Sequence, residues 1–67
     1  MTQEKANKIF ETDIGRQLLS IYVTSDDVPH IRYKEAIAHM NYMLDKDINF
    51  NETIEEWFPN NNIYKTI

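Results

Sequence analysis

Apolar residues in the first third of the chain follow a helical period. They recur in steps of four, four, four and three positions, at Ala6, Phe10, Ile14, Leu18 and Ile21. Such steps place side chains along one face of an α-helix, so the pattern predicts one helix over about residues 3–23. The predicted helix crosses Gly15, which costs about 1 kcal/mol relative to alanine in a helix interior.

The same segment allows a second interpretation, in which the helix ends near Gly15 and a strand follows over residues 18–24. That stretch, LLSIYVT, contains β-branched and aromatic residues that favour a sheet. A strand needs a partner, and the other candidate is the terminal stretch 63–67. The pattern alone leaves this alternative open.

A boundary follows at residues 24–29, TSDDVP. Serine and aspartate side chains accept hydrogen bonds from the free amides of a helix start, and proline suits the first helical position. We therefore expect a second helix over about residues 29–45. Its apolar residues form two stripes. The principal stripe contains Tyr33, Ile37, Met40 and Leu44, and the second stripe contains Ile31, Ala38 and Tyr42.

The last third of the chain predicts a short third helix over about residues 51–58. Asn51 is the expected N-cap, and Pro59 would end the helix. Apolar residues that would share the face closing the helical hairpin stand three and four positions apart, at Ile54, Trp57 and Phe58. Residues 60–67 are expected to form a loose tail, with an edge strand over the last five residues as the alternative.

These elements predict an all-α fold, a small helical hairpin closed by a short third helix, in a single domain over residues 1–67. The second stripe needs a cover, because a helix that packs against one neighbour buries only one stripe. Either the C-terminal segment folds over it, or two copies of the chain pack through it as a homodimer in the form of a bundle. Association would also support the core, since a chain this short buries only about 60% of its unfolded surface.

The chain is acidic, with 7 lysines and arginines against 11 aspartates and glutamates, a net charge of −4. Its basic residues are scattered, whereas a protein that binds duplex nucleic acid needs clustered cations to neutralise phosphates. We therefore expect no direct binding to duplex nucleic acid. Residues 45–58 carry five acids against one lysine and form the acidic end of the sequence. No secretory signal or membrane-spanning apolar run is present, which favours a cytoplasmic protein without membrane contact.

Few residues suggest catalytic chemistry. On one helix, His30 and His39 would point to opposite sides, because nine positions turn the helix by about 180°. They could then bind no common metal within one copy. Glu35 and His39 stand four positions apart, a spacing typical of a solvated ion pair. Without a glycine-rich phosphate loop or a nucleophile motif, we expect no enzymatic activity, no cofactor and no metal centre.

One acidic stretch matches part of the spacing of a calcium-binding loop. Oxygen-bearing side chains occupy six positions of that template, at Asp45, Asp47, Asn49, Asn51, Thr53 and Glu56. The sixth position, normally glycine for a sharp turn, is Phe50, and the eighth position, normally apolar, is Glu52. The ordinary interpretation is an acidic loop that caps a short helix, and a calcium-responsive loop is an alternative.

Together these features favour a small acidic, non-enzymatic interaction protein that binds and modulates or inhibits a larger protein partner. Aromatic residues make up 12% of the chain, and aromatic side chains are frequent at the centres of interfaces. The residues expected to contact a partner are Tyr22, Ile31, Glu35, Ala38, Tyr42, Glu55 and Phe58. An acidic, aromatic surface is attracted to a basic site on a partner. Such a composition is typical of small regulators from phages and mobile elements.

The competing hypothesis is a ligand-binding module. In that case, a groove between two copies, lined by Tyr22 and Tyr42 together with scattered cations, would hold a small nucleotide or metabolite. The sequence does not identify a partner or a ligand.

Overall fold

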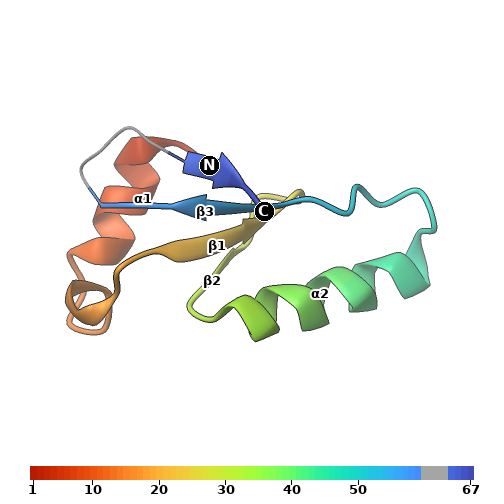
Figure 1. The fold of residues 1–67 in the computed structure, drawn as a ribbon, viewed down its shortest axis with the longest axis horizontal. Coiled ribbons are helices and arrows are strands. Elements are labelled where there is room, and N and C mark those ends of the chain that lie inside the picture. Colours follow the sequence, from red (N-terminus) through yellow and green to blue (C-terminus); the bar gives the residue numbers. More distant parts are fainter. Residues whose placement is uncertain (60–63) are drawn as a thin grey trace.

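The computed structural model describes residues 1–59 and 64–67 and shows a mixed α/β fold. Four short strands form one antiparallel sheet in the order β2-β1-β3-β4, and two helices pack against it (Figure 1). The elements in chain order are α1 (Gln3–Phe10), the 3₁₀ turn η1 (Gly15–Gln17), β1 (Ile21–Thr24), β2 (Pro29–His30), α2 (Tyr33–Lys46), β3 (Ile54–Trp57) and β4 (Tyr64–Thr66). The prediction of an all-α helical hairpin is therefore wrong, and each of the three predicted helices contains a strand.

Helix α1 is much shorter than the helix predicted over residues 3–23. It begins after Thr2, whose hydroxyl oxygen accepts a hydrogen bond from the backbone N–H of Lys5 at 3.2 Å. It ends at Phe10, the last of its apolar residues before the chain turns. The regular steps that continue to Ile21 therefore do not mark one continuous helix.

The chain leaves α1 through a tight turn that depends on glycine. The hydroxyl of Thr12 donates a hydrogen bond to the carbonyl of Ile9 at 2.7 Å, and its oxygen accepts one from the backbone N–H of Gly15 at 3.0 Å. A β-carbon on Gly15 would lie 1.8 Å from the carbonyl oxygen of Ile9. Glycine thus permits η1 to fold back against the end of α1.

The second interpretation of residues 18–24 was correct about a strand but not about its partner. Strand β1 lies inside the sheet between β2 and β3. The terminal strand β4 pairs with β3 instead. Ile21 faces α1 and is 1% exposed. It belongs to a core cluster that contains Ala6, Phe10, Val23 and Trp57.

Strands β1 and β2 form a hairpin where the sequence predicted the start of a helix. The backbone N–H of Asp27 donates to the carbonyl of Thr24 at 2.9 Å, and Asp27 has a φ of 66°. Aspartate adopts this left-handed conformation more readily than most residues and is common in turns. Pro29 lies in the edge strand β2, where proline is tolerated in a sheet. The predicted helix over residues 29–45 therefore begins later, as α2.

The predicted helix over residues 51–58 is strand β3. Ile54 pairs with Thr24, and Trp57 pairs with Ile21, so the two β3 side chains point to opposite faces of the sheet. Both are buried because each face is covered by a different helix. A strand that is buried on both faces loses simple alternation, and its apolar spacing of three positions then resembles a helical one.

The prediction of a loose tail over residues 60–67 is wrong for its last part, because residues 64–66 form the edge strand β4, as the alternative expected. Its pairing with β3 continues to the last residue, where the N–H of Ile67 donates to the carbonyl of Ile54 at 2.8 Å. Residues 60–63 lie outside the described part of the chain. β4 forms one edge of the sheet, and β2 forms the other.

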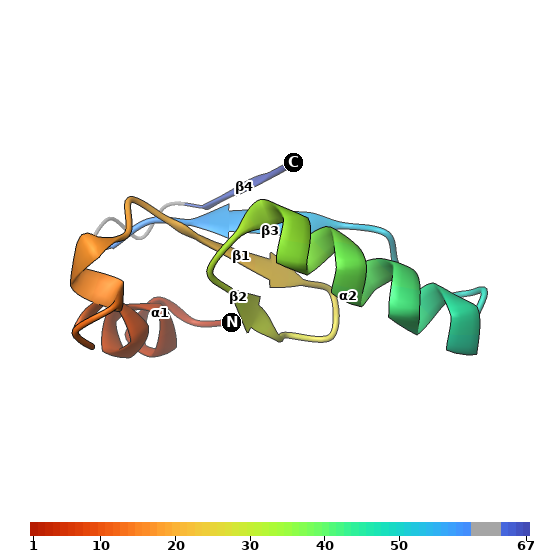
Figure 2. The ribbon, with the colours of Figure 1, turned by 90° about the horizontal axis from the view of Figure 1, so that it is seen from below.

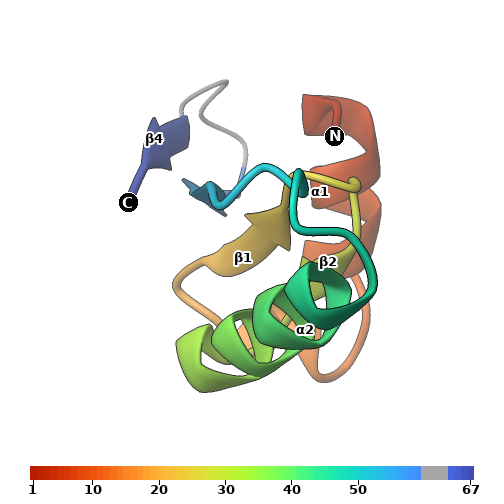
Figure 3. The same cartoon turned by 90° about the vertical axis from the view of Figure 1, so that its right-hand side faces the viewer.

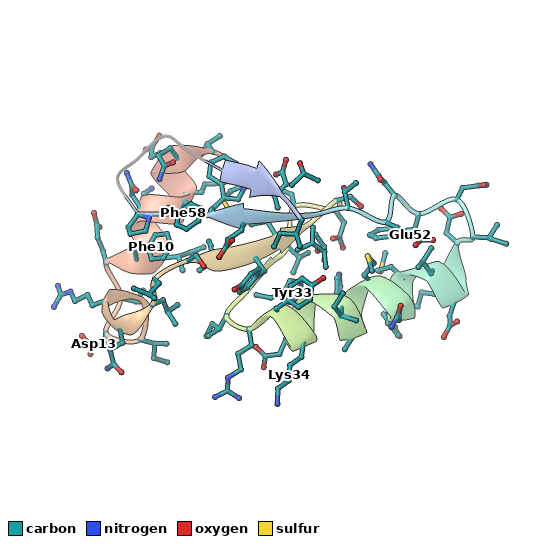
Figure 4. All side chains as sticks on the ribbon, viewed as in Figure 1. Phe10, Asp13, Tyr33, Lys34, Glu52 and Phe58 are labelled. Carbon is teal, nitrogen blue, oxygen red and sulfur yellow. The ribbon has the colours of Figure 1, made fainter. Side chains whose placement is uncertain are left out.

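Helices α1 and α2 cover opposite faces of the sheet (Figure 3). The side chain of Tyr33, at the start of α2, points toward the sheet, whereas that of Lys34 points away from it (Figure 4). Ala36 is the one fully buried residue of α2, and the principal stripe is only half-buried beyond it. The far end of α2 extends past the strands (Figure 2).

Candidate interaction site

The side of α2 that faces away from the sheet carries three of the predicted contact residues. We call Glu35, Ala38 and Tyr42 the outer face of α2. They stand at positions i, i+3 and i+7, which lie within about 60° of one another around a helix. All three are exposed, and Tyr42 is 53% exposed. The structure thus brings these three predicted residues together on one surface.

The ring of Tyr42 is held by a neighbour on the same helix. The ammonium nitrogen of Lys46 lies 4.4 Å from the centre of the ring, which is a cation–π contact. This contact leaves much of the ring open to solvent. Tyr42 therefore presents an aromatic surface with a polar tip, already oriented by the helix.

Acidic side chains gather at the end of α2. Asp45 lies in the last turn of the helix, and Asp47 and Glu52 follow in the segment that leads to β3. All three are exposed, and we call them the acidic end. Glu52 lies toward one end of the molecule, and Asp13 lies toward the other (Figure 4). Part of the negative charge that the sequence places in residues 45–58 therefore lies at and just after the end of α2.

Ile31 is not part of the outer face, so the predicted second stripe is wrong in its first member. The residue lies in the bend between β2 and α2, because α2 begins only at Tyr33. There it lines an open groove of about 390 Å³. We call this the apolar groove, and its apolar side chains are Ile9, Ile14, Leu18 and Ile31. The groove was not predicted, because the helical period placed Ile14 and Leu18 on one continuous helix.

The remaining predicted contact residues lie elsewhere. Tyr22 faces α2 and packs edge-on against Tyr33, with ring centres 5.5 Å apart. Glu55 accepts a hydrogen bond from the indole N–H of Trp57 at 3.2 Å. Phe58 follows β3, and its backbone carbonyl accepts a hydrogen bond from Gln3 at 2.9 Å. These three residues do not join the outer face of α2.

The positions of Tyr22 and Tyr42 also bear on the ligand-binding hypothesis. Tyr22 lies beneath the start of α2, and Tyr42 lies on the side of that helix that faces away from the sheet. Within one copy the two rings therefore do not line a common groove.

A polar cluster that the sequence did not predict connects the β1–β2 turn to α2. We call Thr24, Asp26, His30 and His39 the turn cluster. The hydroxyl of Thr24 donates to Asp26 at 2.5 Å, and Nε2 of His39 lies 2.8 Å from the other carboxylate oxygen. The rings of His30 and His39 have centres 5.0 Å apart. The expectation that the histidines point apart is wrong, because His30 lies in β2 and not in a helix.

The turn cluster shifts the pKa of two of its members. Burial acts to raise the pKa of Asp26, but the hydrogen bonds from Thr24 and His39 outweigh it and lower the pKa below 3.8. Burial lowers the pKa of His30 below 6.5, and the nearby His39 acts in the same direction. At neutral pH the cluster therefore contains an ionised Asp26 beside a neutral His30.

The described residues do not assemble a metal site. Within residues 1–59 and 64–67, no group of three or more histidine, aspartate or glutamate side chains converges in a way that could hold a metal ion. The calcium-loop template is also broken up. Asp45 lies in α2, and Glu56 lies in β3, where it accepts a hydrogen bond from the hydroxyl of Ser20 at 2.6 Å.

In the same described residues, no helix is long and apolar enough to cross a membrane. Comparison with known proteins gives no match, since no family model fits the chain and no curated protein or solved structure is significantly similar to it. The site must therefore be interpreted from its own residues.

Proposed function

We propose that the chain is a small acidic interaction protein without enzymatic activity, which binds a larger protein partner through the outer face of α2 and so modulates or inhibits it. The observation that carries the proposal is the 53% exposure of Tyr42 on a helix whose other side already packs against the sheet. Helices presented in this way dock into grooves on partner proteins through residues spaced as on this face. Tyr42 is the expected anchor.

The neighbours of Tyr42 suit such a role. Ala38, one turn earlier, is small enough to let a partner surface approach the helix closely. The contact with Lys46 limits the motion of the Tyr42 ring before any partner binds. Less conformational entropy is then lost on binding, which is how a pre-ordered side chain increases affinity.

Charge indicates the kind of partner. The acidic end follows Tyr42 along the chain and carries Asp45, Asp47 and Glu52, all exposed. A basic surface would attract this end from a distance and bind it in one orientation. Basic surfaces are what proteins use to neutralise nucleic-acid phosphates. Occupation of such a surface would inhibit the partner by competition.

The test is photo-crosslinking from position 42 in a lysate of the source cells. With a photoreactive phenylalanine derivative in place of Tyr42, we expect one discrete heterologous protein adduct. Excess wild-type chain should compete for the adduct, whereas excess Asp45→Lys/Asp47→Lys double variant should not, because the attraction to a basic surface is removed. Raised salt should weaken the adduct for the same reason.

The matched control places the same photoreactive residue at Lys5 on α1. The Lys5 side chain is 66% exposed but lies on the helix that covers the other face of the sheet. A heterologous adduct of equal yield from position 5 would contradict the proposal. The proposal would also be contradicted if the double variant competed for the adduct as well as the wild-type chain does.

A further inference from the structure

The apolar groove lies between two walls at the end of the molecule opposite the acidic end. One wall runs from the last turn of α1 to η1 and includes Asp13 and Ile14. The other wall is the bend before α2 and includes Ile31. Ile31 is 42% exposed, and Ile14 is 61% exposed although it lines the groove. Ile14 therefore forms both a wall of the groove and a projection at its rim.

We propose that a second copy of this chain occupies the apolar groove, in a two-fold dimer in which Ile14 of each copy enters the groove of the other. A two-fold contact uses the same patch on both copies, so a patch must be complementary to itself. A projection next to a depression meets that condition.

The charges around the groove are also self-complementary. Asp13 lines the groove on the α1–η1 wall, and Arg32 is the exposed residue that directly follows Ile31 in the bend. Neither side chain forms an ion pair within the described residues. When Ile14 enters the partner groove, the α1–η1 wall of one copy faces the bend of the other. Asp13 of each copy then meets Arg32 of the other, and the pair forms twice.

The core of the chain is small, which favours association with a second copy. The buried apolar residues of the described part number seven, and three of them are alanine or valine. Burial of the groove enlarges this small core.

The dimer leaves the second half of α2 and the acidic end free in both copies, because they lie toward the other end of the long axis from the groove (Figure 1). This inference does not require the proposed function. It is tested on the purified chain alone, so its failure and the failure of partner binding are separate results.

The first experiment is sedimentation equilibrium over a range of chain concentrations. We expect the wild type to have twice the 8.0 kDa mass of the chain. Ile14→Asp should raise the dimer Kd at least tenfold, since it places a charge in an apolar contact. The matched control is Ile48→Asp, because Ile48 is 88% exposed but lies just after α2 at the acidic end. It should change the Kd by less than twofold. Circular dichroism confirms that both variants are folded.

The second experiment exchanges the charges across the two-fold axis. Asp13→Lys alone places two cations together at both contacts with Arg32, and Arg32→Asp alone places two acids together at both contacts, so each variant should be monomeric. An equimolar mixture should restore a dimer, because both mixed contacts are attractive. A monomeric wild type, or weakening by Ile48→Asp equal to that by Ile14→Asp, would overturn the proposal. Failure of the mixture to associate would overturn the assigned pairing and with it the two-fold arrangement.

Discussion

Replacement of Gly15 by alanine distinguishes the observed fold from the helix that the sequence suggests. In a continuous helix, this change would remove a penalty and stabilise the protein by about 1 kcal/mol. In the structure, the added β-carbon would lie 1.8 Å from the carbonyl oxygen of Ile9. The two folds therefore predict opposite signs for the same substitution.

The magnitude follows from what the methyl group meets. Its nearest atoms belong to the backbone of Ile9 and Phe10, at 1.8, 2.7 and 2.8 Å, so no side-chain rotation relieves the contact. The turn must shift by more than about 1 Å to bring the shortest distance to ordinary contact. Such a shift strains the hydrogen bonds of Thr12 to the N–H groups of Gly15 and Arg16. Overpacking costs about 1–3 kcal/mol and each lost hydrogen bond about 1 kcal/mol, so we expect a loss of about 2–4 kcal/mol.

The assay is thermal unfolding followed by circular dichroism. For a chain of this size, a loss of about 2–4 kcal/mol lowers the Tm by roughly 10–25 °C. It is also a large part of the total stability of about 3–10 kcal/mol expected for a chain of this length. Arg16→Ala is the control, since Arg16 is an exposed neighbour in the same turn and should change the Tm little. A Tm of Gly15→Ala above the wild-type value would refute the close approach at Ile9.

Three further predictions concern the core, the turn cluster and the outer face. Ile21→Ala should lower the free energy of unfolding by about 2–5 kcal/mol, because Ile21 is 1% exposed. Ile37→Ala should lower it less, because Ile37 is only half-buried. Urea unfolding of both variants measures the two losses. Because the pKa of His30 is lowered in the folded chain, His30 binds a proton more readily in the unfolded chain, and the free energy of unfolding should fall as the pH drops below 6.5. His30→Gln should reduce this fall, which thermal unfolding at several pH values measures. Tyr42→Glu should leave both the helix content and the mass in sedimentation unchanged; a Tyr42→Glu monomer would place the dimer contact on α2 instead of the groove.

The fold could be predicted only in part, because the sheet is covered on both faces. Ile54 and Trp57 are both buried but point to opposite faces. Alternation of polar and apolar residues, the usual sign of a strand, is therefore lost in β3. The regular apolar steps through Ile21 wrongly predicted one helix, because residues of α1, η1 and β1 meet in space without belonging to the same helix. The helical period did identify α2, whose inner stripe packs toward the sheet.

The candidate site was predictable to the extent that it lies on α2. Glu35, Ala38 and Tyr42 were found from helical spacing, which depends only on local geometry. The turn cluster and the apolar groove depend on contacts between separate elements. The histidines meet because a hairpin turn reverses the chain before Pro29, and TSDDVP is compatible both with that turn and with a helix start. Ile31 joined the groove because α2 begins two positions after it.

Helix α2 is attached to the sheet mainly near its beginning. Tyr33 packs on Tyr22, Ala36 is buried, and His39 bonds to the turn at Asp26, whereas the last turns extend past the strands. The free energy of local opening should therefore decrease along the helix toward Lys46, because fewer contacts oppose it there. The helix is thus fixed to the sheet at its N-terminal end and has few contacts at its C-terminal end. A protein that grips the free end would slow amide exchange along the whole terminal segment.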